Sequence, residues 1–180
     1  MALITSIQIV KKTSMSGSVD VNNYRHLIDI AQVTSLEPLI GSTLYRKIVA
    51  DQDAGTLTGV YETIYNNYII DFLCHTVYAM YLKDANVLAK NGGVFERTQD
   101  GFANPDLSSL ESLYKQAQSI SDVYAQRLVN FLCSENVPEY DNQDNDYDVD
   151  PRNNDLIGGL YLGNNYGLQE YYDAFGNKIK

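Results

Sequence analysis

Mostly apolar side chains recur at helical spacing over two long stretches of the chain, residues 58–83 and 105–133. A return every three or four positions is typical of a helix that buries one face. In the first stretch the recurring residues are Tyr61, Ile64, Tyr65, Tyr68, Ile69, Phe72, Leu73, Thr76 and Met80. In the second they are Leu107, Leu110, Leu113, Tyr114, Ala117, Ile120, Tyr124, Leu128, Phe131 and Leu132. At about 1.5 Å per residue each helix would reach roughly 40 Å, and we expect the two to pack antiparallel at the centre of the fold.

Shorter elements precede the first long helix. Residues 4–10 alternate loosely and include β-branched side chains, which predicts a short strand. Asp20 is placed to cap a helix that begins at Val21. The inward side of that helix would be Tyr24, Leu27, Ile28 and Ala31. Two short helical pieces are expected next, at 35–40 and 43–51, with a break at Gly41 between them.

A small hairpin is expected between the two long helices. Residues 84–90 would prolong the first helix, and Asn91-Gly92-Gly93 would end it. Residues 94–98 and 102–103 predict two short strands, joined by a tight turn at Gln99-Asp100-Gly101. The predicted fold class is therefore mainly α: a helical bundle around two long antiparallel helices, with a small β-hairpin between them and an extended C-terminal arm.

The composition changes after residue 138. Residues 139–155 are acidic and rich in Asn, which is typical of a mobile arm with little to bury. Residues 156–180 regain apolar content, but they are too few to form a domain. We expect a helical domain at 1–138, an acidic linker at 139–155 and a Tyr-rich tail at 156–180 that contacts a neighbouring subunit or ring. The expected contact residues are Leu160, Tyr161, Leu162, Tyr166, Tyr171, Tyr172 and Phe175.

The charge is negative and unevenly placed. The formal net charge is −10, and residues 139–180 carry nine Asp/Glu against three Lys/Arg, a balance of −6. A protein that grips nucleic-acid phosphates needs a basic footprint, so the charge argues against that class. It leaves open a channel through which DNA slides without sticking.

Tyrosine is unusually common, with 15 copies against five Phe and no Trp. A Tyr side chain combines a large contact area with a hydrogen-bonding tip, which suits a surface that becomes buried in an assembly. Replacement of Phe by Tyr in a proteome rich in polar residues is the other interpretation, and both stay open.

The two cysteines, Cys74 and Cys133, lie inside apolar helical runs, which predicts buried, reduced thiols. The first twelve residues do not resemble a signal peptide, because their charges follow the apolar part. The most apolar segment, 61–82, contains acidic, amide and histidine side chains that a bilayer span would not carry. We therefore expect a protein made and kept in a reducing cytoplasm.

Catalytic chemistry is not indicated by the histidines. His26 and His75 each sit in an amphipathic run without a zinc-ligand pattern around them, which favours structural roles. Cys74 and His75 are neighbours, but neighbours on a helix point about 100° apart and cannot form a nucleophile–base contact. We predict no enzyme activity and no cofactor.

A calcium site is weakly suggested in the acidic segment. Five aspartates occupy positions 1, 3, 5, 7 and 12 of a twelve-residue window, as in an EF-hand loop. They are Asp144, Asp146, Asp148, Asp150 and Asp155. Val149 stands at the sixth position, where that loop needs Gly, and Pro151 follows the run. A solvated acidic linker is the favoured interpretation.

Several short motifs follow one another in a characteristic order. They are Ala31-Gln32, Leu36-Glu37-Pro38-Leu39-Ile40-Gly41, Leu44-Tyr45, the long helix, Gly92-Gly93-Val94 with its hairpin, Tyr124 through Leu132, and Pro138-Glu139-Tyr140. In order and spacing they resemble the head-to-tail connector (adaptor ring) proteins of tailed bacteriophages, in particular the neck ring proteins of crAss-like phages of Bacteroidales. The matching features cover about two thirds of the chain.

This resemblance implies a structural virion protein that forms a twelve-fold ring beneath the portal, extends the DNA channel and joins capsid to tail. Its partners would be further copies of itself, the portal protein, the next neck or tail ring protein, and genomic DNA passing the lumen without specific binding, with no membrane. It would be located at the head–tail junction of the virion. The alternative is a monomeric acidic helical adaptor or inhibitor that binds a host protein.

Overall fold

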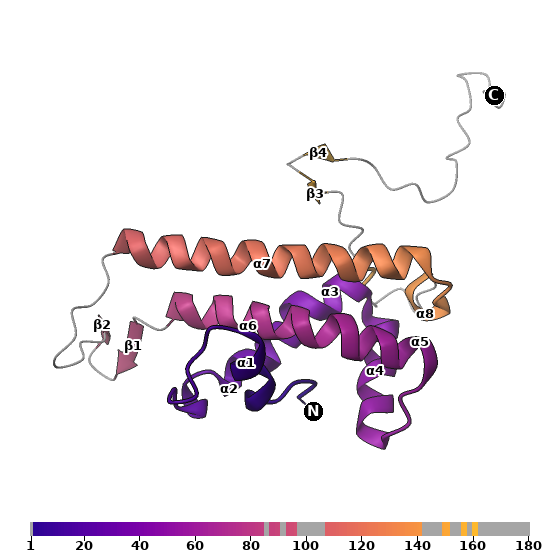
Figure 1. The fold of residues 1–180 in the computed structure, drawn as a ribbon, viewed down its shortest axis with the longest axis horizontal. Coiled ribbons are helices and arrows are strands. Elements are labelled where there is room, and N and C mark those ends of the chain that lie inside the picture. The colour runs from indigo at the N-terminus through magenta and orange to yellow at the C-terminus, as the bar shows by residue number, and fades with distance from the viewer. Residues whose placement is uncertain are drawn as a thin grey trace.

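The structure of the protein is a computed structural model, and it is mainly α (Figure 1). It describes most of the chain, in the ranges 2–84, 87–90, 93–96, 107–141, 149–151, 156–157 and 160–161. Across these ranges, no helix combines the length and the apolar character needed to cross a bilayer.

The first element is a helix, α1 (Ser6–Lys12), where we predicted a strand. A capping box starts it: Gln8 donates its backbone N–H to Thr5 Oγ1 at 3.3 Å, and Gln8 Oε1 accepts from the Thr5 N–H at 2.7 Å. Ile9 then points into the core and is fully buried, whereas Ile7 is exposed. The loose alternation predicted a strand, but the cap at Thr5 satisfies the N–H groups of a helix.

Residues 21–40 form a chain of short helical pieces. Asp20 accepts a hydrogen bond from the Asn22 N–H at 2.9 Å, as the predicted cap requires, although it starts the 3₁₀ turn η1 (Val21–Asn23). The helix α2 (Arg25–Ala31), the π-helical turn η2 (Gln32–Leu36) and α3 (Glu37–Ile40) follow. The predicted inward residues Tyr24, Leu27, Ile28 and Ala31 are all buried.

Gly41 separates α3 from α4 (Ser42–Ala54), as predicted. Its φ of +81° lies in a region that residues with a Cβ rarely adopt, so glycine allows the sharp change of direction. The next helix starts directly afterwards, with Ser42, Leu44 and Ile48 buried against the rest of the domain.

The first predicted long helix is confirmed as three consecutive segments. These are α5 (Gly59–Ile64), the π-helical turn η3 (Tyr65–Ile69) and α6 (Ile70–Asp84). Both π-helical turns also hold the start of the chain, because the Leu3 N–H donates to Gln32 Oε1 at 2.5 Å and Tyr65 Oη donates to the Leu3 carbonyl at 2.6 Å. These two hydrogen bonds thereby tie the N-terminal residues to η2 and to η3.

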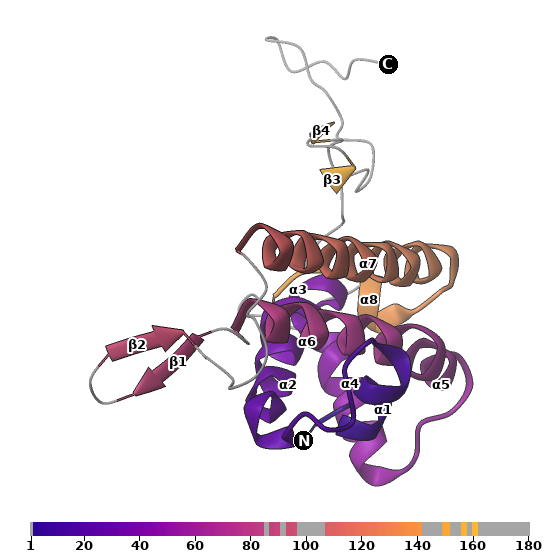
Figure 2. The ribbon, with the colours of Figure 1, turned by 60° about the vertical axis from the view of Figure 1, so that its left-hand side comes forward.

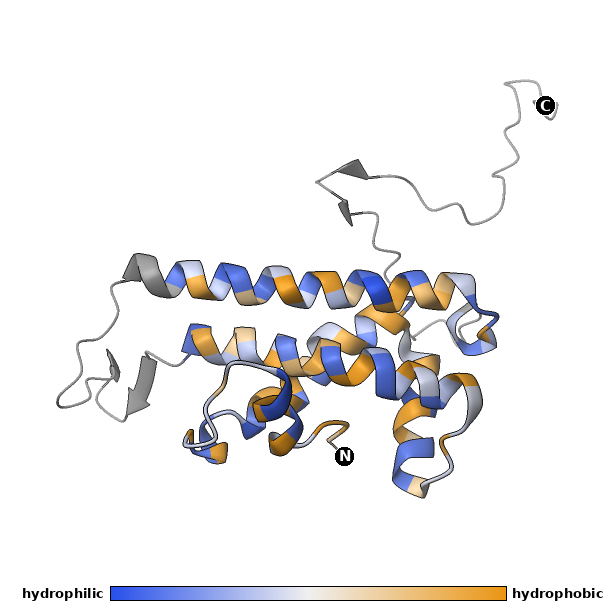
Figure 3. Ribbon diagram, in the orientation of Figure 1, coloured by the Kyte–Doolittle hydropathy of each residue, from blue (hydrophilic) through white to orange (hydrophobic). Residues whose placement is uncertain are grey.

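The second predicted long helix is α7 (Leu107–Ser134), which lies alongside α6 (Figures 1 and 2). Contacts join them along their length: Tyr68 stacks on Phe131 at 4.6 Å and His75 on Tyr124 at 4.8 Å between ring centroids. In the buried part of this interface, Thr76 Oγ1 and Ser121 Oγ are 2.8 Å apart. Hydrophobic and hydrophilic stretches alternate along these helices, as amphipathic packing requires (Figure 3).

Two short strands lie between α6 and α7. β1 (Val87–Lys90) pairs antiparallel with β2 (Gly93–Glu96), with Lys90 opposite Gly93. The predicted prolongation of the first helix over 84–90 is therefore wrong for Val87–Lys90. Asn-Gly is a strong hairpin signal in its own right, so the reversal falls between Lys90 and Gly93. The turn predicted at 99–101 and the strand at 102–103 lie outside the described residues.

The segment after α7 returns to the domain twice, whereas we expected a mobile arm. The short helix α8 (Pro138–Asp141) follows Val137 and buries Tyr140. Farther along, Val149 exchanges two hydrogen bonds with Ser42, and Pro151 is buried. Acidic composition alone does not exclude such contacts, because main-chain groups make them. The strands β3 (Leu156–Ile157) and β4 (Leu160–Tyr161) pair antiparallel beyond this point.

The cysteines differ from each other. Cys74 is buried as predicted, but Cys133 is exposed. Consecutive residues on a helix point about 100° apart, so the run Phe131-Leu132-Cys133 cannot place all three side chains in the core. Of the three, Leu132 is the residue whose side chain lies in the core, at 1% exposed.

Replacing Phe72 with Ala should lower the free energy of unfolding by about 3–5 kcal/mol, because it removes a buried aromatic ring from α6. Chemical denaturation followed by circular dichroism measures this. Val123→Ala on the solvent side of α7 is the control and should cost less than about 0.5 kcal/mol. Equal losses for the two variants would contradict the assignment of the buried face.

Candidate functional site

Most residues predicted for an interface lie beyond the part of the chain that the structure describes. Of the seven tail residues, the backbone of Leu160 and Tyr161 forms β4. The other five lie outside the described residues, so their contact role stays a prediction. They are Leu162, Tyr166, Tyr171, Tyr172 and Phe175.

Of the five aspartates in the calcium hypothesis, one lies within the described residues, and the hypothesis stays a prediction. Asp150 is exposed and follows the residue that pairs with Ser42. The others, Asp144, Asp146, Asp148 and Asp155, lie outside the described residues. Within the ranges that are described, no group of three or more His, Cys, Asp and Glu side chains is close enough to hold a metal ion.

Cys74 and His75 occupy an interior part of α6. Burial raises the pKa of the Cys74 thiol to about 12, so the thiol is protonated and a poor nucleophile at neutral pH. Burial lowers the pKa of His75, which stacks on Tyr124 of α7. The neutral ring packs there as a flat aromatic surface. His26, in contrast, is exposed on α2.

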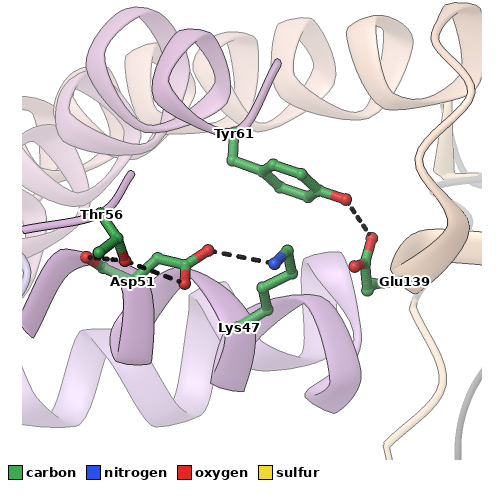
Figure 4. Close-up of polar contacts among 5 residues, drawn as sticks. All are labelled: Lys47, Asp51, Thr56, Tyr61 and Glu139. Carbon is green, nitrogen blue, oxygen red and sulfur yellow. Dashed lines mark hydrogen bonds and ion pairs between the residues drawn. The ribbon is translucent and has the colours of Figure 1, made fainter. Parts of the chain in front are cut away.

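A polar network joins α4, α5 and α8 at one end of the domain (Figure 4). Tyr61 Oη donates a hydrogen bond to Glu139 Oε2 at 2.6 Å. On the other side of the phenol ring, Lys47 Nζ lies 4.6 Å from the ring centroid and 3.2 Å from Asp51 Oδ2. The network therefore holds the segment that leaves α7 against two earlier helices.

The chemistry of this network is structural. Burial, followed by the hydrogen bond to Glu139, raises the pKa of Tyr61 to about 12. The phenol therefore keeps its proton and remains a donor to the carboxylate over the whole physiological range. A hydrogen bond to a charged acceptor contributes about 1.5–3 kcal/mol when it is shielded from water.

A pocket of about 240 Å³ opens between the π-helical turn η2, α3, α6 and α7. Phe72, Leu39 and Pro38 supply its apolar wall, and the hydroxyls of Thr76 and Ser121 lie on its polar side. Those two hydroxyls already bond to each other. The pocket lacks charged groups other than Asp122 among its lining residues, so it gives no indication of a particular ligand.

An exposed apolar flank on α7 was missed by the sequence analysis. We predicted that Leu113 and Ile120 point inward, but they are 46% and 38% exposed, and Val123 is 57% exposed. At 100° per residue these three side chains fall within about 80° of one another, at one edge of the stripe that carries Leu128 and Leu132. The ten predicted residues span about 140° of the helix, a single broad face, so periodicity alone did not show that its edge is exposed.

Comparison with known proteins gives one match. A model described as "Family of unknown function (DUF6712)" matches residues 36–148, more than half of the chain. The protein therefore belongs to this family. No curated protein and no solved structure is significantly similar to the chain.

Replacing Tyr61 with Phe should lower the free energy of unfolding by about 1–2 kcal/mol at pH 7, because Glu139 loses its phenol donor. The raised pKa means that this contribution is present in full below pH 10, the ordinary value, and is lost as the pH rises towards 12. Urea denaturation of both proteins between pH 7 and 12 measures the difference.

Tyr78→Phe on the same long helix is the matched control, and it should follow the wild-type pH dependence. A Tyr61→Phe variant as stable as the wild type at pH 7 would show that the network does not hold α8.

Proposed function

We propose that this member of the DUF6712 family is a structural virion protein that forms a homomeric ring below the portal, extends the DNA channel and joins capsid to tail. The observation that carries the proposal is the order and spacing of the motifs around Leu36-Glu37-Pro38-Leu39-Ile40-Gly41, which resemble those of phage connector proteins. In this proposal the protein acts by assembly and has no catalytic role.

The proposed subunit is a helical block at 1–138 in which two long antiparallel helices form the centre. A small β-hairpin lies between these helices, the acidic linker at 139–155 follows, and the tail at 156–180 extends to a neighbouring subunit or ring. The exposed apolar flank of α7 supports this proposal, because Leu113, Ile120 and Val123 offer a surface that a second subunit could cover.

The proposed partners are the portal protein, the next neck or tail ring and other copies of this chain. Twelve copies would match the portal, and genomic DNA would pass through the lumen. The net charge of −10 supports this role, since an acidic lumen repels phosphates and lets DNA slide. The protein would be made in the host cytoplasm and located in the virion neck.

The second candidate is a monomeric acidic adaptor or inhibitor that binds a host protein. The observation in its favour is the balance of −6 over residues 139–180, which can present acidic groups in the way that a DNA mimic does. The two candidates differ in oligomeric state and in their response to the portal.

Mixed with purified portal protein at micromolar concentration, the full chain should form a complex whose mass by multi-angle light scattering matches one ring per portal. Ile120→Glu should prevent ring closure, because it buries a charge at the subunit contact. Asn66→Glu is the matched control, since this residue is exposed on η3 and lies outside the α7 flank.

No association between the portal and the wild-type chain under these conditions would reject the connector assignment. Assembly of Ile120→Glu as efficient as that of Asn66→Glu would remove the α7 flank from the proposed contact.

Deleting residues 156–180 should leave the helicity and melting temperature unchanged but prevent entry into the ring. The reason is that the tail is too short to bury its own apolar residues, so it needs a neighbour. Circular dichroism and light scattering with the portal measure the two effects. If the truncated chain unfolds, the tail is part of the subunit core and the proposed contact role is wrong.

A further inference from the structure

The turn between α3 and α4 binds the backbone of a segment more than a hundred residues later in the chain. The Val149 N–H donates to Ser42 Oγ at 3.1 Å, and the Ser42 N–H donates to the Val149 carbonyl at 3.0 Å. Both main-chain groups of Val149 are therefore used, while its side chain is 43% exposed. Recognition of this kind depends on an extended backbone and hardly on the side chain.

The Ser42 side chain is oriented for this contact by a residue of its own turn, Glu37. Its hydroxyl donates to Glu37 Oε1 at 2.7 Å, which leaves the oxygen lone pairs available to accept from Val149. Gly41, at φ +81°, turns the chain so that α4 begins at Ser42, and the first N–H groups of a helix have no partner inside it. Ser42 is only 5% exposed, so these bonds are shielded from water.

A second observation agrees with a held segment: Pro151, two residues beyond Val149, is buried. The site therefore combines a paired backbone at one residue with a buried ring at the next but one. The side chains of Val149 and Asp150 are both exposed, so the segment is held through the main chain of Val149 and the ring of Pro151.

We propose that the Glu37–Gly41–Ser42 turn is a binding site for an extended chain segment, and that it anchors residues 149–151 so that the C-terminal tail leaves the domain beside α4. Without the anchor, the tail from Leu156 onward would be tethered at Asp141, the end of α8. With the anchor, the tether runs from Pro151 to Leu156, which is about a third of the distance along the chain from Asp141 to Leu156. Shortening a flexible tether threefold raises the effective concentration of what it carries about fivefold.

The anchor itself does not depend on the proposed ring, but its use does. If the tail contacts a neighbouring subunit, as proposed above, the anchor decides which edge of the domain the tail reaches from. The test below uses the isolated chain, so that failure of the anchor and failure of the ring give different results.

Trypsin cleavage after Arg152 reports on the anchor in the full-length protein. A protease holds its substrate extended, so residues 149–151 must leave Ser42 before the next bond is cut. Cleavage after Lys178 serves as an internal reference for protease activity, and cleavage after Arg127, inside α7, reports opening of the helical domain.

Two variants remove the same hydrogen bond from opposite ends. Ser42→Ala removes the acceptor without changing the substrate sequence, and Val149→Pro removes the donor. Each should raise the ratio of cleavage after Arg152 to cleavage after Lys178 about five- to tenfold. The double variant should raise this cleavage ratio no further than either single variant does, because both substitutions remove the same hydrogen bond. Matched short peptides with Val or Pro at position 149 correct for the intrinsic preference of trypsin.

Two further variants are the controls. Thr34→Ala removes a hydroxyl that bonds only locally to the Ile30 carbonyl, and Val149→Ala keeps the backbone pairing. Both should leave the cleavage ratio within twofold of the wild type. Hydrogen exchange of the Val149 amide in the unmodified protein provides a measurement that needs no variant, and the amide should exchange at least tenfold more slowly than in the matched peptide.

The proposal is overturned if the Val149 amide exchanges as fast as in the peptide. It is also overturned if Ser42→Ala and Thr34→Ala give the same cleavage ratio. If the exchange and cleavage results support the anchor but the chain does not bind the portal, the anchor stands and the proposed ring is rejected.

Discussion

The burial of α6 from two sides is the constraint on which the rest of the structure depends. Phe72, Leu73, Cys74, Thr76 and Val77 are consecutive or nearly so, and all are buried. A helix covers only one face when it packs on one partner, so this pattern requires elements on both sides. α1 and α2 pack on one side and α7 on the other. The N-terminal helices and α7 are therefore held together through this helix.

The two sides of α6 are packed with different chemistry. Towards α7, stacked rings and a hydroxyl pair alternate along the interface, which fixes the register of one helix against the other. Towards α1, an ion pair joins Lys12 to Asp71, and Ile9 fills the apolar space. The interface with α7 is therefore the more specific of the two, whereas the interface with α1 relies on apolar filling and a single charged contact.

Sequence analysis predicted the elements whose signal is local and periodic. The two long helices and the break at Gly41 were predicted because each depends on residues that lie close together in the chain. The helix at Ser6–Lys12 was missed because a cap, rather than periodicity, decides it. The pairing of Ser42 with Val149 was beyond local patterns, since two main-chain groups far apart in the sequence leave no trace in composition. For the candidate site, the acidic and Tyr-rich character of the C-terminal region was read from the sequence, but Leu113 and Ile120 were predicted to be inward and are 46% and 38% exposed.

The π-helical turn η3 has a consequence for how one helix can serve two sets of partners. A π-helical turn holds one more residue than an α-helical turn between successive hydrogen bonds, so it changes the rotational phase of the segments on either side by about 100°. Tyr61, before the turn, faces Glu139 of α8, whereas Tyr68 within it and His75 beyond it face α7. Because these residues are spaced by seven, an uninterrupted α-helix would place Tyr61, Tyr68 and His75 within about 40° of one another, on one face. The π-helical turn rotates the segment before it relative to the segment after it. A single helix can therefore contact α8 at one end and α7 along the rest.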